Sequence, residues 1–168
     1  MATLSAEEMV GLWQQHTMAE FVHKDVEAAL STMTEDAHVL CVAAGTGGWG
    51  KEGVRKFYGE FIPAVPPDFM PLPISQTVGG SRLVEEAIYR FTHSIAMDWM
   101  LPGVPATHKP VELALVGIIE FRDGKIASEH LYWDQATILA QLGIVPAMPA
   151  IGSLEAHRRM RELVESRS

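Results

Sequence analysis

Four polar residues in the second half of the chain have the side-chain types that acid/base chemistry requires. His93 and Asp98 lie in one extended, largely apolar segment, and His130 and Asp134 lie in a later one. A histidine or carboxylate in the wall of an apolar pocket has a pKa shifted by burial and neighbouring charges, so it can exchange protons near neutral pH. We therefore take His93, His130 and Asp134 as candidate catalytic residues and Asp98 as a candidate for substrate contact.

The spacing of these residues decides which of them can face one pocket. Side chains alternate along a strand, so His130, Tyr132 and Asp134 share one face and the residues between them share the other. Four residues of strand span roughly 13 Å, so His130 and Asp134 cannot bond each other, although both could face one substrate. The pattern predicts that this face looks into the pocket.

Each candidate also has a purely structural interpretation. Asp134 stands where a helix is expected to begin, and aspartate is preferred at helix N-caps. His130 and His93 could be core histidines bonded to backbone groups, as buried polar groups usually are. Asp98 lies beside a turn, where aspartate is common. The residues alone leave both interpretations open.

Large aromatic and methionine side chains are expected around the pocket, although such residues more often simply fill a core. Tyr58 and Phe61 follow Val54 at helical spacing, which places all three on one face of a helix. With Asp98, the residues expected to contact a substrate are Trp13, Trp49, Tyr58, Phe61, Met97 and Tyr132.

The composition excludes several classes of protein. The chain has 168 residues, with 21 acidic and 13 basic side chains and a formal net charge of −8. This balance argues against nucleic acid and against an anionic membrane face as partners, because both are bound through clustered Lys and Arg. The single cysteine, Cys41, excludes an intramolecular disulfide, and the scattered histidines lack metal-ligand spacing, so no metal is expected. With neither a secretion signal nor a membrane-spanning run, we expect a cytoplasmic protein.

A glycine-rich segment matches two phosphate-binding motifs but lacks their context. Residues Gly45–Gly50 fit G-x-G-x-x-G, and with Lys51 they fit G-x-x-x-x-G-K. The second motif needs a hydroxyl where Glu52 stands, and the first needs a following parallel strand. The segment is therefore predicted to be a glycine-rich turn at the rim of the pocket.

The remaining pattern predicts an α+β domain. Ser5 and Glu8 form a capping-box pattern before a first helix, and prolines between Pro63 and Pro73 exclude a central strand there. The other expected elements are helices at 24–33 and 134–141 and from Ser153, and strands at 37–44, 83–97, 111–121 and 125–133, the last two joined by an Asp-Gly turn. Helices segregated from an antiparallel meander suggest a cone-shaped, curved and mostly antiparallel sheet, covered by the N-terminal helices.

Several motifs between Glu7 and Gly143 resemble the SnoaL-like branch of the nuclear transport factor 2-like superfamily. They are Gly53–Tyr58, Trp99–Thr107, Phe121–Ile126 running into Glu129–Gln135, and Leu139–Gly143. Where relatives often read Pro-Thr-Gly, this chain has Ala106-Thr107-His108.

The resemblance implies a cone-shaped α+β barrel over residues 1–145, with 146–168 as a linker and peripheral helix, and usually a homodimer without a cofactor. It implies cyclase, isomerase or dehydratase chemistry on a small apolar carbonyl compound. Asp134 would move the proton, His130 would orient or share it, and His93 with Tyr58 or Trp13 would position the substrate oxygen. The alternative is a non-catalytic ligand-binding or dimerisation module, because fold alone does not assign function.

Overall fold

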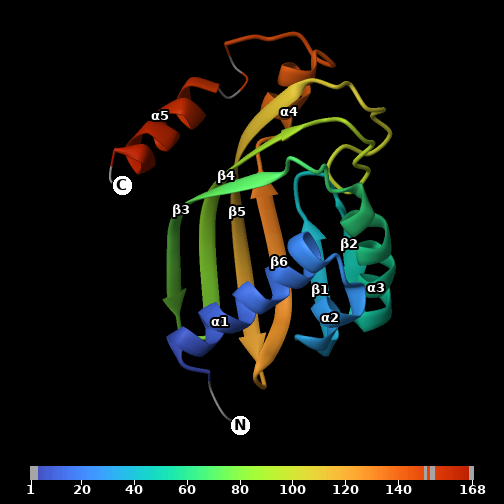
Figure 1. Cartoon of the computed structure of the whole chain (residues 1–168), viewed down its shortest axis with the longest axis vertical. Helices are drawn as coiled ribbons and strands as arrows, with labels where there is room; N and C mark the ends of the chain where they lie inside the picture. Colours follow the sequence, from blue (N-terminus) through green and yellow to red (C-terminus); the bar gives the residue numbers. More distant parts are fainter. Residues whose placement is uncertain (1–3, 150, 152–153, 167–168) are drawn as a thin grey trace.

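A curved sheet of six strands forms the centre of the computed structural model, which describes residues 4–149, 151 and 154–166 (Figure 1). The strands are β1 (Met33–Cys41), β2 (Thr46–Trp49), β3 (Met70–Gly79), β4 (Arg82–Thr92), β5 (Pro110–Arg122) and β6 (Lys125–Trp133). Their order is β2-β1-β6-β5-β4-β3, and every neighbouring pair is antiparallel except β1 with β6. The α+β class and the mostly antiparallel curved sheet expected from the sequence are confirmed.

Helices cover one face and one edge of this sheet. They are α1 (Ala6–Thr17), α2 (Val26–Ser31), α3 (Gly50–Phe61), α4 (Gln135–Leu142) and α5 (Leu154–Glu165), with a π-helical segment η1 (Met18–His23) after α1 and a 3-10 turn η2 (Ile62–Ala64) after α3. Figure 1 shows α1 crossing the sheet, which defines the inner face, while α3 flanks β1 and β2. None of the described helices is long and apolar enough to cross a membrane.

The local signals in the sequence set several of these boundaries. Ser5 and Glu8 form the expected reciprocal capping box at the start of α1. The turn at Asp123 and Gly124 has positive φ at both residues (53° and 75°) and closes the β5–β6 hairpin. Gly143, with φ of 73°, ends α4 in the left-handed conformation.

Other boundaries differ from the expectation. The proline-rich segment forms β3, an edge strand that pairs only with β4, and an edge tolerates Pro71 and Pro73 because one side of the strand needs no ladder bonds. The strand expected at 83–97 ends at Thr92, where residues 93–109 leave the sheet as a loop. The first strand begins earlier than expected, at Met33.

The last helix rests on the far end of the sheet. Its expected start, Ser153, lies outside the described residues, and α5 is described from Leu154. His157 lies 3.2 Å from the backbone oxygen of Glu112 on β5, and Arg161 donates to the Glu112 side chain at 2.7 Å. These contacts attach the helix to β5 at the periphery.

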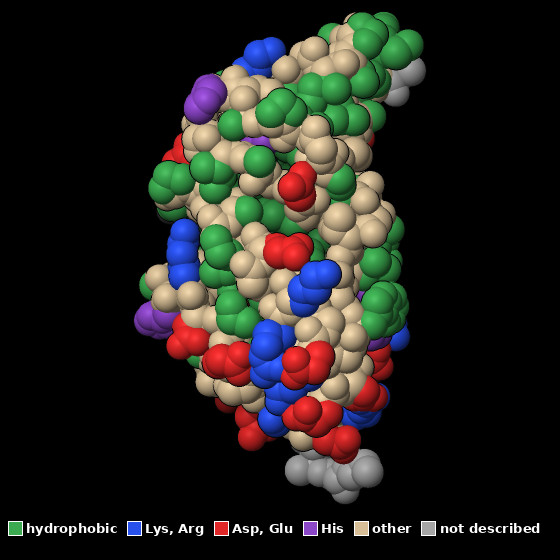
Figure 2. Space-filling model, turned by 90° about the vertical axis from the view of Figure 1, so that its right-hand side faces the viewer, with side chains coloured by type: hydrophobic (Ala, Val, Ile, Leu, Met, Phe, Trp, Pro, Cys, Tyr) green, Lys and Arg blue, Asp and Glu red, His purple; other side chains and the backbone are tan. Residues whose placement is uncertain are grey.

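Ion pairs gather on the surface formed by α2, α3 and β1. Figure 2 shows acidic and basic side chains interleaved at the lower end of this face. Lys51 pairs with Glu35, and Arg55 pairs with Glu27 and Glu52. Such exposed pairs stabilise a fold by about 0–1 kcal/mol each, so they contribute little to the stability of this one.

Two glycines of the Gly45–Gly50 segment, Gly47 and Gly48, are packed closely against neighbouring backbone. A Cβ added to Gly48 on β2 would overlap the backbone of Gly53 on α3, whereas one added to Gly59 on the exposed side of α3 would meet nothing within 4 Å. Glycine at position 48 is thus required by the approach of α3 to β2.

We predict that Gly48→Ala destabilises the protein and Gly59→Ala does not. Overpacking at position 48 should cost about 1–3 kcal/mol or more, because backbone must move. Gly59→Ala should stabilise by up to about 1 kcal/mol through helix propensity. Urea unfolding of the two variants measures both effects, and equal midpoints would contradict the packing argument.

Candidate active site

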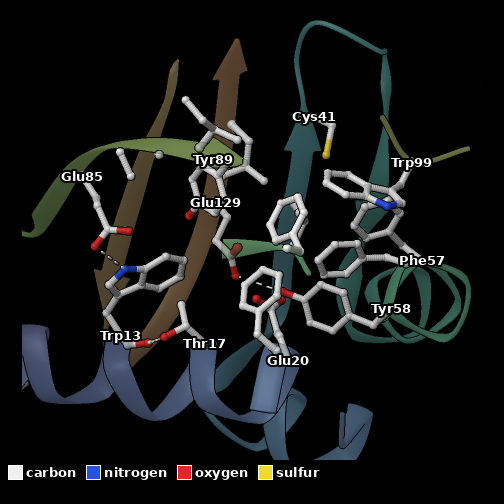
Figure 3. Close-up of a pocket in the computed structure, with 18 residues that line it drawn as sticks. Trp13, Thr17, Glu20, Cys41, Phe57, Tyr58, Glu85, Tyr89, Trp99 and Glu129 are labelled. Atoms are coloured by element: carbon white, nitrogen blue, oxygen red, sulfur yellow. Dashed lines mark hydrogen bonds between the residues drawn. The ribbon is translucent and has the colours of Figure 1, made fainter. Parts of the chain in front are cut away.

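A cavity lies between the inner face of the sheet and the helices α1, η1 and α3 (Figure 3). Eight of the 18 residues that line it are aromatic. Its volume is about 50 Å³. On the same measure, about 10–15 Å³ is enough for one water molecule. The structure therefore contains a hollow, largely apolar interior at the place where the α1 helix crosses the sheet.

Four polar side chains from four elements of the fold meet at one end of this cavity. His16 comes from α1, Glu20 from η1, Tyr58 from α3 and Glu129 from β6. Glu20, Tyr58 and Glu129 line the cavity, and His16 lies behind them with a fully buried side chain. We call these four residues the buried cluster.

The distances within the buried cluster are those of hydrogen bonds. The Nε2 atom of His16 lies 2.9 Å from Oε1 of Glu129, 3.3 Å from Oε1 of Glu20 and 3.0 Å from the Tyr58 hydroxyl. That hydroxyl also donates to Oε1 of Glu129 at 3.0 Å. One imidazole and one phenol thus converge on the Glu129 carboxylate.

The second ring nitrogen of His16 shows that this imidazole is doubly protonated. The hydroxyl of Thr32 donates to the backbone oxygen of Ala29 at 2.7 Å, so it can only accept from Nδ1 of His16, which lies 2.7 Å away. Nδ1 therefore carries a proton. Nε2 faces the carboxyl groups of Glu129 and Glu20, which favour a second proton on this nitrogen, so His16 is an imidazolium at neutral pH.

Burial and neighbouring charges shift the pKa values of His16, Glu20 and Tyr58 in the buried cluster. Burial alone would lower the pKa of His16, but the carboxylates of Glu129 and Glu20 outweigh it and raise that pKa to about 10. Burial raises the pKa of Glu20 and raises that of Tyr58 well above its usual range. Burial therefore favours the neutral form of Glu20, whereas the two carboxyl groups favour the charged form of His16.

A π-helical segment brings Glu20 to the cavity. His16 and Glu20 are four residues apart, a spacing at which side chains on a regular helix meet. The chain changes from α to π winding at Met18, between these two residues. Single π-helical turns are rare in proteins, and those that occur are frequently found at functional sites.

The same atoms are the one group of three potential metal ligands within 4.8 Å in the described part of the chain. They belong to His16, Glu20 and Glu129. The separations also satisfy a purely hydrogen-bonded imidazolium with two carboxyl groups. The geometry therefore already accounts for these groups through proton sharing.

The structure separates the three residues expected to be catalytic. Asp134 is exposed, caps α4 by accepting from the backbone N–H of Thr137, and does not line the cavity. The Thr137 hydrogen bonds lower the pKa of Asp134, so it stays ionised as a cap. The expectation that its carboxylate looks into the cavity is therefore not met.

The two histidines also lie elsewhere. The Nε2 atoms of His130 and His38 are 2.9 Å apart on the outer face of the sheet. His93 is buried at the start of the 93–109 loop, where its Nδ1 accepts from the backbone N–H of Thr107 at 3.3 Å. Neither histidine lines the cavity.

The residues expected to contact a substrate are divided between the cavity and other places. Trp13, Tyr58 and Phe61 line the cavity, and their contact with a substrate stays a prediction. Met97 is buried apart from it, and Asp98 is exposed and accepts from the backbone N–H of Gly103 at 2.9 Å. Trp49 and Tyr132 are 66% and 41% exposed, and Trp49 stacks on His38.

Three cluster residues were not among the sequence candidates: His16, Glu20 and Glu129. One signal was available, because His16 follows Trp13 by three residues and precedes Glu20 by four on the apolar side of the first helix. The alternation along β6 was also read correctly, but the inner face is the one with Glu129 and Leu131. No sequence signal marked the π turn.

Comparison with known proteins identifies the family. Residues 13–142 match the family described as SnoaL-like polyketide cyclase, so the chain belongs to the SnoaL-like polyketide cyclase family. A comparison with curated protein sequences found no significant match.

Solved structures share the fold. A candidate SnoaL-like polyketide cyclase from Jannaschia sp. CCS1 is 15% identical with a TM-score of 0.70, covering 87% of this chain and 100% of that one. IdmH, a candidate polyketide cyclase from Streptomyces antibioticus, is 27% identical with a TM-score of 0.58, covering 82% and 97%. TerC, co-crystallised with polyporic acid, is 16% identical with a TM-score of 0.58, covering 82% and 99%.

We predict that stability falls as the pH rises above neutrality because of His16. Its pKa is raised from 6.5 to about 10 on folding, so the stabilisation is fully present below the unfolded pKa and is lost as the pH rises towards 10. The slope should approach about 1.4 kcal/mol per pH unit for one proton. Urea unfolding between about pH 7 and pH 8.5 measures it, below the ordinary pKa of 9.0 for Cys41.

His16→Gln is the control, because glutamine can still hydrogen-bond but cannot bind the proton. The variant should be less stable at pH 7 and should show a flatter dependence on pH. A slope equal to that of the unsubstituted chain would show that His16 is not the titrating group.

Proposed function

We propose that this protein is a cofactor-independent enzyme of the cyclase type, which performs acid/base chemistry on a small apolar carbonyl compound. The observation that carries the proposal is the pair of carboxyl groups, Glu129 and Glu20, at one end of an aromatic cavity. We assign the ionised form to Glu129 and the protonated form to Glu20, whose neutral form burial favours. Such pairs supply the acid and the base of proton-transfer enzymes. The matched family and IdmH support a cyclase-type reaction.

Glu129 is the proposed general base. Among the described residues, its Oε1 is the atom that meets His16 and Tyr58, which leaves Oε2 to take a proton from the carbon next to a substrate carbonyl. The imidazolium and the phenol hold the carboxylate in place. His16 and Tyr58 are thus positioning residues for Glu129.

Glu20 is the proposed general acid. Kept neutral by burial, it donates a hydrogen bond to the carbonyl oxygen as that oxygen gains negative charge. In an aldol ring closure, Glu129 takes the proton from carbon, and the resulting enolate carbon bonds to a second carbonyl carbon. The alkoxide formed there takes the proton of Glu20, and proton transfer from Glu129 to Glu20 restores both groups.

The substrate is proposed to be flat and largely apolar. Aromatic rings such as Phe57, Phe61 and Trp99 form the cavity wall, and aromatic rings stack on planar ligands. TerC, a structural neighbour, was co-crystallised with polyporic acid, and this supports a small organic molecule as the ligand.

We also propose that the chain forms a homodimer through the outer face of its sheet. Val84 and Tyr132 on this face are 37% and 41% exposed, and Trp49 on the edge strand β2 is 66% exposed. Apolar residues grouped on a sheet face opposite the covering helices are typical of an association surface. Light scattering after gel filtration should give about twice the chain mass, and Val84→Lys should shift it towards the monomer.

We predict that Glu129→Gln abolishes turnover and Asp134→Asn does not. Removing the base should lower kcat by at least about 10²-fold. Asparagine caps helices about as well as aspartate, so activity and stability of Asp134→Asn should stay within about twofold and about 0.5 kcal/mol. Mass spectrometry of a panel of linear and partly cyclised polyketide esters, incubated with each variant, measures product formation.

The reverse pattern, with Asp134→Asn inactive and Glu129→Gln active, would assign the base to the helix cap. Ligands recovered at unchanged mass from the unsubstituted protein would instead favour the non-catalytic binding module. Incubation with EDTA should leave turnover unchanged, because every proposed step uses side chains of this chain.

A further inference from the structure

The cavity has a second polar end, formed by Glu85 on β4. This residue lies away from the buried cluster, next to Trp13 (Figure 3). Trp13, Glu85 and Tyr89 line both the cavity and an open groove between η1 and β3. Glu85 therefore stands where the cavity meets the outside, and any substrate that enters from this groove passes it.

The charge of Glu85 is not balanced by a cation. Its Oε2 accepts from Nε1 of Trp13 at 3.3 Å and from Nε2 of Gln76 at 2.9 Å, and both donors are neutral. Among the described residues, no Lys, Arg or His lies within ion-pair distance of it, and its Oε1 accepts no hydrogen bond. At the inner end, by contrast, the imidazolium of His16 compensates Glu129.

The rest of the cavity wall adds to the negative potential. No Lys, Arg or His is among the described residues that line it. The faces of aromatic rings such as Trp13 and Tyr89 are electron-rich and attract cations. A carboxylate or phosphate on the ligand would meet Glu85 without any compensating positive charge, whereas an ammonium group would be stabilised by both features.

We infer that Glu85 is a specificity residue, which selects ligands carrying a protonated basic nitrogen and rejects those carrying a carboxylate at the same place. The bound nitrogen lies against Oε1 of Glu85 and the ring of Trp13 while the carbonyl part of the molecule reaches the buried cluster. This inference rests on the proposed function for the identity of the ligand site, and it concerns binding only.

The test compares three probes of similar size and different charge: 2-naphthylmethylammonium, 2-naphthylmethanol and 2-naphthoate. Isothermal titration at neutral pH gives the Kd of each for the full chain. The ammonium probe should bind at least about tenfold more tightly than the carboxylate probe, with the alcohol between them. Equal or tighter binding of 2-naphthoate, or no binding of any probe, would overturn the inference.

Two variants assign the selectivity to one side chain. Glu85→Gln keeps the oxygen that accepts from Trp13 but removes the charge, and should reduce the ratio of the two Kd values by at least about fivefold. Glu86→Gln makes the same change one residue on, at the outer face where Ser75 donates to it, and should leave the ratio within about twofold. If the ratio of the two Kd values were the same in both variants, the assignment of the selectivity to Glu85 would be wrong.

The outcome is separable from that of the proposed function. Selective binding without any product from the ester panel would overturn the catalytic proposal and leave this inference standing. Product formation together with equal binding of the charged probes would overturn this inference and leave the catalytic proposal standing.

Discussion

The fold around the cavity depends on one electrostatic constraint: a charge taken out of water must be paired. Isolated buried ions cost several kcal/mol each even after the protein relaxes. Here the imidazolium of His16 and the carboxylate of Glu129 neutralise each other across 2.9 Å, and Tyr58 adds a hydrogen bond. Because the three side chains come from α1, β6 and α3, this pairing fixes how the helices sit over the sheet. Burial raises the pKa of Glu20 and so favours its neutral form, which adds no second charge to the group.

Much of the fold could be predicted from local signals, because those signals act over a few residues. The capping box at Ser5 and the Asp-Gly turn at Gly124 each lie where the sequence places them. The class of fold followed from the order of helices and strands. The β3 edge strand was missed because proline excludes a strand from the middle of a sheet but not from its rim. The parallel β1–β6 pair depends on contacts between distant segments, which no local pattern encodes.

The site was harder to predict, and β6 shows why. Alternation correctly separated two sets of side chains, but it does not say which set faces inward. Asp134 and His130 are candidates because their residue types suit catalysis. The apolar residue Leu131, which shares a face with Glu129, is the one that indicates the inner face. A polar residue on an otherwise apolar face is the stronger indication of a site, because burying it has to be compensated.

The π-helical segment between Met18 and His23 has a consequence for how such a cavity changes over evolutionary time. In a regular helix each residue turns the chain by about 100°, so the loss of one residue from this segment would rotate everything beyond it by that angle. Loss of one residue between Glu20 and Lys24 would leave His16 and Glu20 in place and would turn the chain that leads into α2. One codon of length after Glu20 therefore changes how the chain enters α2, while both carboxyl groups of the chamber keep their places.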